Sequence, residues 1–181
     1  MRFLHLSDVH VTSDYGRHPF LRLGWRRWIA LGELTFGGRA RAFARAPQTI
    51  GRILEDATAL QVDHVILSGD LTAYALPDEF QGARTALGRW AEEPRRCTVI
   101  PGNHDRYTPG AHRTRRFEQT FGNLLVSDLP DVAVEEGFPF VRLLGDRDAV
   151  IGLQSARVPY FPGLSYGIVG RRQREALAAL L

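Results

Sequence analysis

The sequence predicts an α/β protein in which short buried strands alternate with amphipathic helices. Three apolar runs, at residues 2–7, 62–68 and 97–100, have the length and composition of strands. Apolar residues recur at helical spacing across 47–60 and 77–92, the two segments between those runs. Strands and helices that alternate in this order are typical of an open sheet with buried strands.

The remaining sequence adds shorter elements. Helices are predicted at 112–121 and 170–181, and strands at 138–144 and 148–153. Gly145 and the residues up to Asp148 are expected to form the turn of a hairpin between these two strands. Because the chain has 181 residues, of which 44% are hydrophobic, we expect a single domain over residues 1–181.

Composition and charge narrow the class of protein. All 23 basic residues are arginines and the net charge is +3, which fits either a genome rich in G and C or two-point recognition of phosphate by guanidinium groups. The single cysteine, Cys97, lies in an apolar run, so a buried thiol and a reducing compartment are expected. No signal peptide and no apolar stretch of about 20 residues is evident, which predicts a cytoplasmic protein.

Each of the first three strand candidates is followed by polar residues of types that bind metals. These residues are Asp8-Val9-His10, Gly69-Asp70 and Gly102-Asn103-His104-Asp105. If the strands are neighbours, their polar ends meet at the carboxyl edge of one sheet, where α/β proteins bind ligands. Gly69 and Gly102 are expected to permit tight turns and a close approach of the backbone.

These side chains suit two divalent ions that act on a phosphate ester. Such ions neutralise the phosphate, activate a water molecule and accept carboxylate and imidazole ligands together. Asp8 and His10 are expected to point to one side of an extended backbone, Asp70 to offer a bridging carboxylate and Asn103 a neutral oxygen. We expect His104 to stabilise the phosphoryl charge or protonate the leaving oxygen, and Asp105 to orient His104.

The chain resembles the calcineurin-like metallophosphoesterase superfamily over essentially its whole length. The resemblance is carried by "RFLHLSDVH", "DHVILSGDLT", the Glu79-Phe80 pair and "VIPGNHDRY". It implies a β-sandwich flanked by helices, and the cyclic-nucleotide-phosphodiesterase-like branch is the most similar. It further implies that a metal-bound hydroxide attacks a phosphomonoester or phosphodiester in line, with two ions of Mn, Fe or Zn.

The resemblance also assigns roles to individual residues. It implies that Asp8 and His10 bind the first metal, that Asp70 bridges and that Asn103 binds the second. His104 takes the acid or charge-stabilising role, with Asp105 behind it.

The histidines depart from the family pattern. The family supplies one more histidine on a later strand and two in a Gly-His-x-His motif, whereas this sequence has none after His112. Because residues 173–181 are helical and end without a stop signal, we expect the chain to be the N-terminal portion of a longer phosphoesterase. A truncated or degenerate member without catalysis is the alternative. His5 is expected in the core or behind the site, and His18, His64 and His112 on the surface.

Residues 17–45 form a basic, aromatic insertion relative to the family. They contain seven arginines and one acidic residue, Glu33, and Gly24 to Phe36 fit an amphipathic helix. The segment could be a cap that contacts phosphate, nucleic acid or a membrane surface. We favour a helix packed on the domain with its arginines in water, because most such apolar stripes are core contacts.

A small phosphorylated substrate is the expected partner. Two alternatives within the superfamily are a DNA nuclease, for which the arginines would give a salt-sensitive affinity, and a nucleotide-lipid pyrophosphatase. Nucleic acid is not the favoured partner, and peripheral membrane contact through 17–45 is an open alternative. The sequence predicts neither the substrate, the metal nor the oligomeric state.

Overall fold

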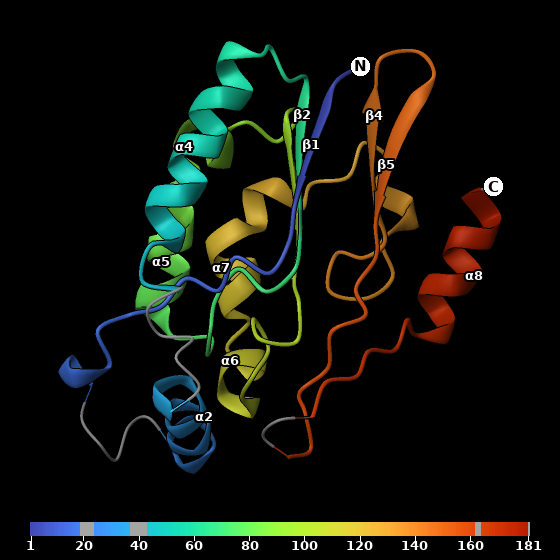
Figure 1. The fold of residues 1–181 in the computed structure, drawn as a ribbon. Helices are drawn as coiled ribbons and strands as arrows, with labels where there is room; N and C mark the ends of the chain where they lie inside the picture. Colours follow the sequence, from blue (N-terminus) through green and yellow to red (C-terminus); the bar gives the residue numbers. More distant parts are fainter. Residues whose placement is uncertain (19–23, 37–42, 162–163, 181) are drawn as a thin grey trace.

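The first three strands, each predicted from an apolar run, are neighbours in one parallel sheet (Figure 1). The computed structural model describes residues 1–18, 24–36, 43–161 and 164–180. The strands β1 (Phe3–Leu6), β2 (His64–Ser68) and β3 (Cys97–Ile100) lie in the order β1-β2-β3. Because β2 pairs in parallel with both neighbours, the three strands end at the same edge of the sheet.

Helices α4 (Ala46–Ala59) and α5 (Pro77–Leu87) pack side by side against the sheet (Figure 1). Both have a proline in the first turn, as predicted. The helix expected to run to residue 92 ends earlier because Gly88 adopts a φ of 55°, and the 3-10 helix η2 (Gly88–Glu92) follows. The helix expected over 112–121 is divided into α6 (Pro109–Arg113) and α7 (Arg116–Phe121), since Arg115 has a φ of 50°.

The hairpin predicted in the second half is confirmed. Strands β4 (Phe140–Leu144) and β5 (Asp148–Gly152) pair antiparallel, and β5 contacts β3. Gly145 opens the turn with a φ of 66°, a conformation that glycine adopts readily. Helix α8 (Arg171–Leu180) follows, and the short helices η1 (Tyr15–Arg17), η3 (Gly122–Leu124) and η4 (Pro130–Val132) complete the described fold. The α/β class is therefore confirmed.

Apolar side chains of the parallel sheet and its helices form the core. Cys97 lies within it, as predicted, and burial raises the pKa of its thiol to about 12. The surface position predicted for His64 is wrong: it is fully buried, and its ring contacts Thr98 Oγ1 at 2.8 Å and the Arg95 carbonyl at 3.0 Å. The core position predicted for His5 is also wrong, because β1 is an edge strand that exposes this residue. His18 and His112 are partly buried.

The helix expected in the insertion is present as α2 (Trp25–Phe36). The face that it packs against the domain is not the one that we expected. Arg27 is only 6% exposed and donates to the carbonyls of Tyr74 and Ala75, whereas Trp25 is 58% exposed. The favoured interpretation, with the aromatic stripe packed and the arginines in water, is therefore wrong for these residues. Within the described ranges, every helix is too short or too polar to cross a membrane.

Candidate metal centre

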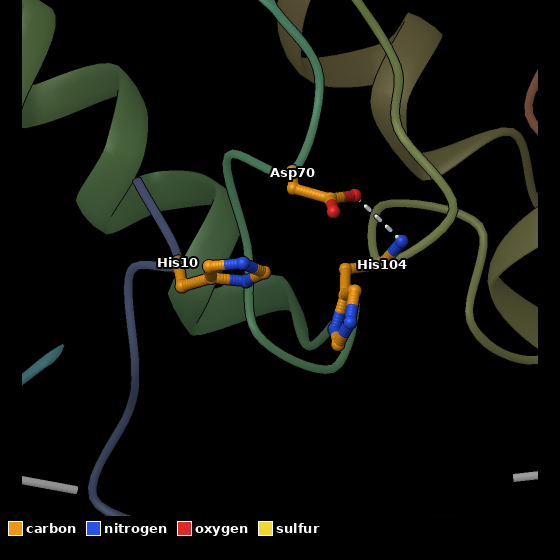
Figure 2. Close-up of side chains that lie close together, drawn as sticks. All are labelled: His10, Asp70 and His104. Carbon is orange, nitrogen blue, oxygen red and sulfur yellow. Dashed lines mark hydrogen bonds between the residues drawn. The ribbon is translucent and has the colours of Figure 1, made fainter. Parts of the chain in front are cut away.

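Three loops at the carboxyl edge of the parallel sheet bring His10, Asp70 and His104 together (Figure 2). Each offers one ligand atom, and these atoms lie within 4.8 Å of one another. The two imidazole rings meet edge to face, with centroids 4.7 Å apart. Imidazole nitrogens and a carboxylate oxygen are a donor set that Zn, Mn and Fe accept. The strand-end prediction therefore holds for these three residues.

The loop after β1 is held in place by hydrogen bonds to the loop after β2. The amide of His10 donates to the Asp70 carbonyl at 2.9 Å, and the amide of Val11 to the Leu71 carbonyl at 2.8 Å. The extended backbone that we expected for Asp8 and His10 is wrong, since their φ angles are 54° and 46°. Asp70 is also left-handed, at 52°. Strained backbone of this kind is concentrated at functional sites.

The two glycines of the motifs are required by close packing, as predicted. A Cβ at Gly102 would lie 2.1 Å from Asp70 Oδ1, which leaves no room for any other residue. Gly69 has a φ of 95°, and a Cβ there would lie 2.9 Å from Gly102 Cα. The loops after β2 and β3 therefore touch through their backbones.

Asp105 holds these loops together rather than orienting His104, which corrects its predicted role. Its carboxylate is 1% exposed and accepts from the amides of Leu71 at 3.2 Å, Thr72 at 2.9 Å and Gly102 at 2.9 Å. The Thr72 hydroxyl donates to it as well, at 2.9 Å. Burial raises the pKa of Asp105 to about 6, although the amides of Gly102 and Thr72 oppose that shift.

A backbone carbonyl orients His104 instead. Nδ1 of His104 lies 2.6 Å from the carbonyl oxygen of Ala73, so Nδ1 carries a proton and donates it. Nε2 is then the nitrogen available for chemistry. The ring stacks on Tyr107 with centroids 5.6 Å apart, and its backbone amide donates to Asp70 Oδ1 at 2.9 Å (Figure 2).

His10 is suited to a metal by its environment. Burial lowers the pKa of its imidazole, and the neighbouring His104 lowers it further, against the opposing charges of Asp70 and Asp8. A neutral ring is the form that binds metals. Its Nδ1 is buried with no hydrogen-bond partner of good geometry, and Phe43 packs against the ring at 4.9 Å between centroids. The residues present therefore fit a divalent ion.

Asp8 and Asn103, the other two predicted ligands, lie close to members of the cluster in the sequence. Oδ1 of Asp8 is 3.9 Å from Nε2 of His10, and its side chain is 68% exposed. Oδ1 of Asn103 accepts a hydrogen bond from Ser165 Oγ at 3.2 Å. Asp8 is not part of the cluster of three, and the Asn103 side chain connects its loop to a distant segment of the chain, so their role as ligands stays a prediction.

A buried hydrogen-bond network lies behind His104, and it was not predicted from the sequence. Glu79 is 0% exposed and accepts from the Tyr15 hydroxyl at 2.7 Å and from the amides of Tyr74 and Leu76 at 2.9 and 3.0 Å. These bonds fix the loop that carries Ala73, whose carbonyl orients His104. Glu79 is the third residue of α5, a helix that begins with Pro77. This position could have indicated that Glu79 caps the start of the helix.

Glu79 gives a pH-dependent stability. Burial raises its pKa to about 7 from an ordinary 4.5, so its protonation stabilises the fold below about pH 4.5, and this contribution is lost as pH rises through 7. A Glu79→Gln variant can keep the hydrogen bonds but does not titrate. Urea unfolding should show that the free energy of unfolding falls between pH 5 and pH 8 by about 1–3 kcal/mol more in the wild type than in the Glu79→Gln variant. Equal losses in both proteins would contradict this expectation.

The ends of the parallel strands place two imidazoles and a carboxylate together, and this group could hold a metal ion. The family model for calcineurin-like phosphoesterase matches residues 1–161, and the chain belongs to that family. Membership indicates a metal-dependent hydrolase that acts on phosphoric esters, in agreement with the cluster. A search of curated proteins found no matching sequence.

Proposed function

We propose that this protein hydrolyses a phosphomonoester or phosphodiester at the edge formed by His10, Asp70 and His104. The observation that carries the proposal is the convergence of two imidazoles and a carboxylate at the ends of parallel strands, with one polar atom of each within 4.8 Å of the others. Strained backbone at His10 and Asp70 supports it, because a fold retains such strain where a site needs it.

Asp8, His10, Asp70 and Asn103 are the proposed ligands of two divalent ions, of Mn, Fe or Zn. When bound, such ions supply neutralisation of the phosphoryl charge and a more acidic water. His104 is proposed to act at Nε2, where it gives a proton to the leaving oxygen as the bond from phosphorus to that oxygen breaks. Its Nδ1 is held by the Ala73 carbonyl, so a proton released at Nε2 leaves a neutral ring of fixed orientation.

Several finer assignments belong to the same proposal. We place the chain in the cyclic-nucleotide-phosphodiesterase-like branch and in the cytoplasm. We treat the parallel sheet and the β4-β5 hairpin as parts of the β-sandwich that the resemblance implies. The further histidine ligands that the resemblance implies have no counterpart in this sequence after His112.

A nucleotide-lipid pyrophosphate is a second candidate substrate. Exposed aromatic residues on α2 and on the segment around Tyr160 favour this substrate. That segment lies near the proposed site, because its Ser165 contacts Asn103. A substrate with an apolar part could use both surfaces at once.

The test is hydrolysis of bis-p-nitrophenyl phosphate by chelator-treated protein, with and without added Mn²⁺. We expect activity that depends on Mn²⁺ and falls roughly 10²–10⁴-fold in a His104→Ala variant, the usual contribution of a general acid. His5→Ala is the matched control, since His5 is exposed on β1 outside the cluster, and its activity should match the wild type.

Equal activity in the His104→Ala variant would contradict the role of this residue. A folded protein that binds Mn²⁺ but does not hydrolyse the ester would favour the non-catalytic alternative.

A further inference from the structure

Two segments far apart in the sequence expose large apolar side chains beside the candidate metal centre. We call this set the aromatic surface, and its members are Trp25, Trp28 and Ile29 of α2 and Tyr160, Phe161 and Leu164 of the segment after β5. Tyr160 and Phe161 are 75% and 66% exposed, and Trp25 is 58% exposed. Such large exposed apolar patches mark interaction sites.

Arg26 joins the two halves of the aromatic surface. Its guanidinium donates to the carbonyls of Pro159 at 2.5 Å and Tyr160 at 2.8 Å. The same group lies 5.2 Å from the centre of the Trp25 ring. Trp25 and Tyr160 are therefore neighbours, although 135 positions separate them in the sequence (160 − 25). One cation holds both halves in place.

The described parts of the second half are tied together at their base. An antiparallel bridge between Ala156 and Gly167 closes the base, and the Tyr166 hydroxyl donates to the Val158 carbonyl at 3.0 Å. The rings of Tyr160 and Tyr166 stack with centroids 5.6 Å apart. Tyr160 and Phe161 are therefore exposed on a segment whose base is braced by these contacts.

Charge on these segments is almost entirely positive. Residues 17–45 hold seven arginines and one acidic residue, and residues 155–170 hold one arginine and no acidic residue. Among the described arginines, Arg26 lies between Trp25 and Tyr160, whereas Arg27 is buried and Arg17 is paired with Asp14 at 3.0 Å. Projecting aromatic side chains beside arginines are the composition of surfaces that lie in the interface of an anionic bilayer.

We propose that the aromatic surface docks on a membrane of anionic phospholipids. Trp25, Tyr160 and Phe161 enter the headgroup region, and Arg26, which lies among them, contributes the positive charge that attracts an anionic surface. A lipid surface is favoured over a small ligand because Trp25, Tyr160 and Phe161 are 58%, 75% and 66% exposed. Ser165, on the same loop, bonds to Asn103, so docking brings the candidate metal centre close to the bilayer.

The test is flotation of the purified chain with vesicles of phosphatidylglycerol and phosphatidylcholine, beside vesicles of phosphatidylcholine alone. We expect binding to the anionic vesicles that weakens with salt. The tryptophan emission should shift to the blue on binding, because Trp25 and Trp28 are exposed and only Trp90 is buried among the three tryptophans.

A Phe161→Ser variant should bind about tenfold more weakly, the expected loss for one large apolar side chain that leaves lipid. Leu60→Ser is the matched control, since Leu60 is 64% exposed at the end of α4 and outside the aromatic surface, and its binding should be unchanged. Both variants alter exposed residues, so circular dichroism should show an intact fold.

Three results would overturn the proposal. The first is no binding of the wild type to anionic vesicles at low salt. The second is equal binding by the Phe161→Ser variant. The third is a wild-type dimer that Phe161→Ser makes monomeric without vesicle binding, which would assign the aromatic surface to contact between two copies of this chain.

Discussion

Replacing Asp70 by asparagine is expected to lower Mn²⁺-dependent hydrolysis by about 100-fold or more. Asp70 is the acidic member of the cluster of three, and its substitution removes the charge that attracts a divalent ion. Even residues that only support metal ligands contribute about 10–100-fold to affinity or activity. The asparagine oxygen can still accept the 2.9 Å hydrogen bond from the His104 amide, so the loop should keep its shape.

The measurement is the rate of ester hydrolysis at saturating Mn²⁺ beside circular dichroism of the same sample. Asp56→Asn is the control, because Asp56 is an exposed carboxylate on α4 and its rate should match the wild type. An Asp70→Asn protein as active as wild type would show that this carboxylate takes no part in the site.

Replacing Asp105 by asparagine is expected to lower the free energy of unfolding by about 2–4 kcal/mol and to abolish hydrolysis. The carboxylate accepts four hydrogen bonds, shared between its two oxygens. In either orientation, the new amide nitrogen faces at least one buried backbone N–H, and an unsatisfied buried group costs about 1–3 kcal/mol. Because these bonds tie the Asp70 loop to Gly102, the site should lose its geometry as well.

Urea unfolding and the pH profile of hydrolysis together test this role for Asp105. A Thr72→Val variant removes only the hydroxyl that donates to Asp105, so it should cost about 1 kcal/mol. If Asp105 acted mainly on the proton affinity of His104, the pH profile would move while stability stayed near that of the wild type. That result would contradict the positioning role.

The strands and helices were predictable because burial leaves a periodic mark on the sequence. Apolar runs ending at Gly69-Asp70 and Gly102-Asn103 identified both the strands and the edge at which they meet. The glycines were informative for the same reason, since a residue without a side chain is required where the Gly102 backbone touches Asp70. His10, Asp70 and His104 were therefore named from the sequence.

Hydrogen bonds between side chains and main-chain groups could not be predicted from the sequence. The sequence could not indicate that Asp105 accepts amide N–H groups or that Ala73 orients His104, because any residue can provide those groups. His64 was misplaced because a polar side chain is usually exposed, whereas here its two ring nitrogens find partners inside the core. α2 was predicted with the wrong face inward because Arg27 binds main-chain carbonyls far away in the sequence.

Calorimetric titration of Mn²⁺ into the chelator-treated chain tests most directly whether the strand ends form a metal centre. We expect saturable binding in the wild type that is lost in a His10→Ala variant and retained in His5→Ala, since His10 lies in the cluster and His5 does not. Absence of binding by the folded wild type, or equal binding by the His10→Ala variant, would contradict it.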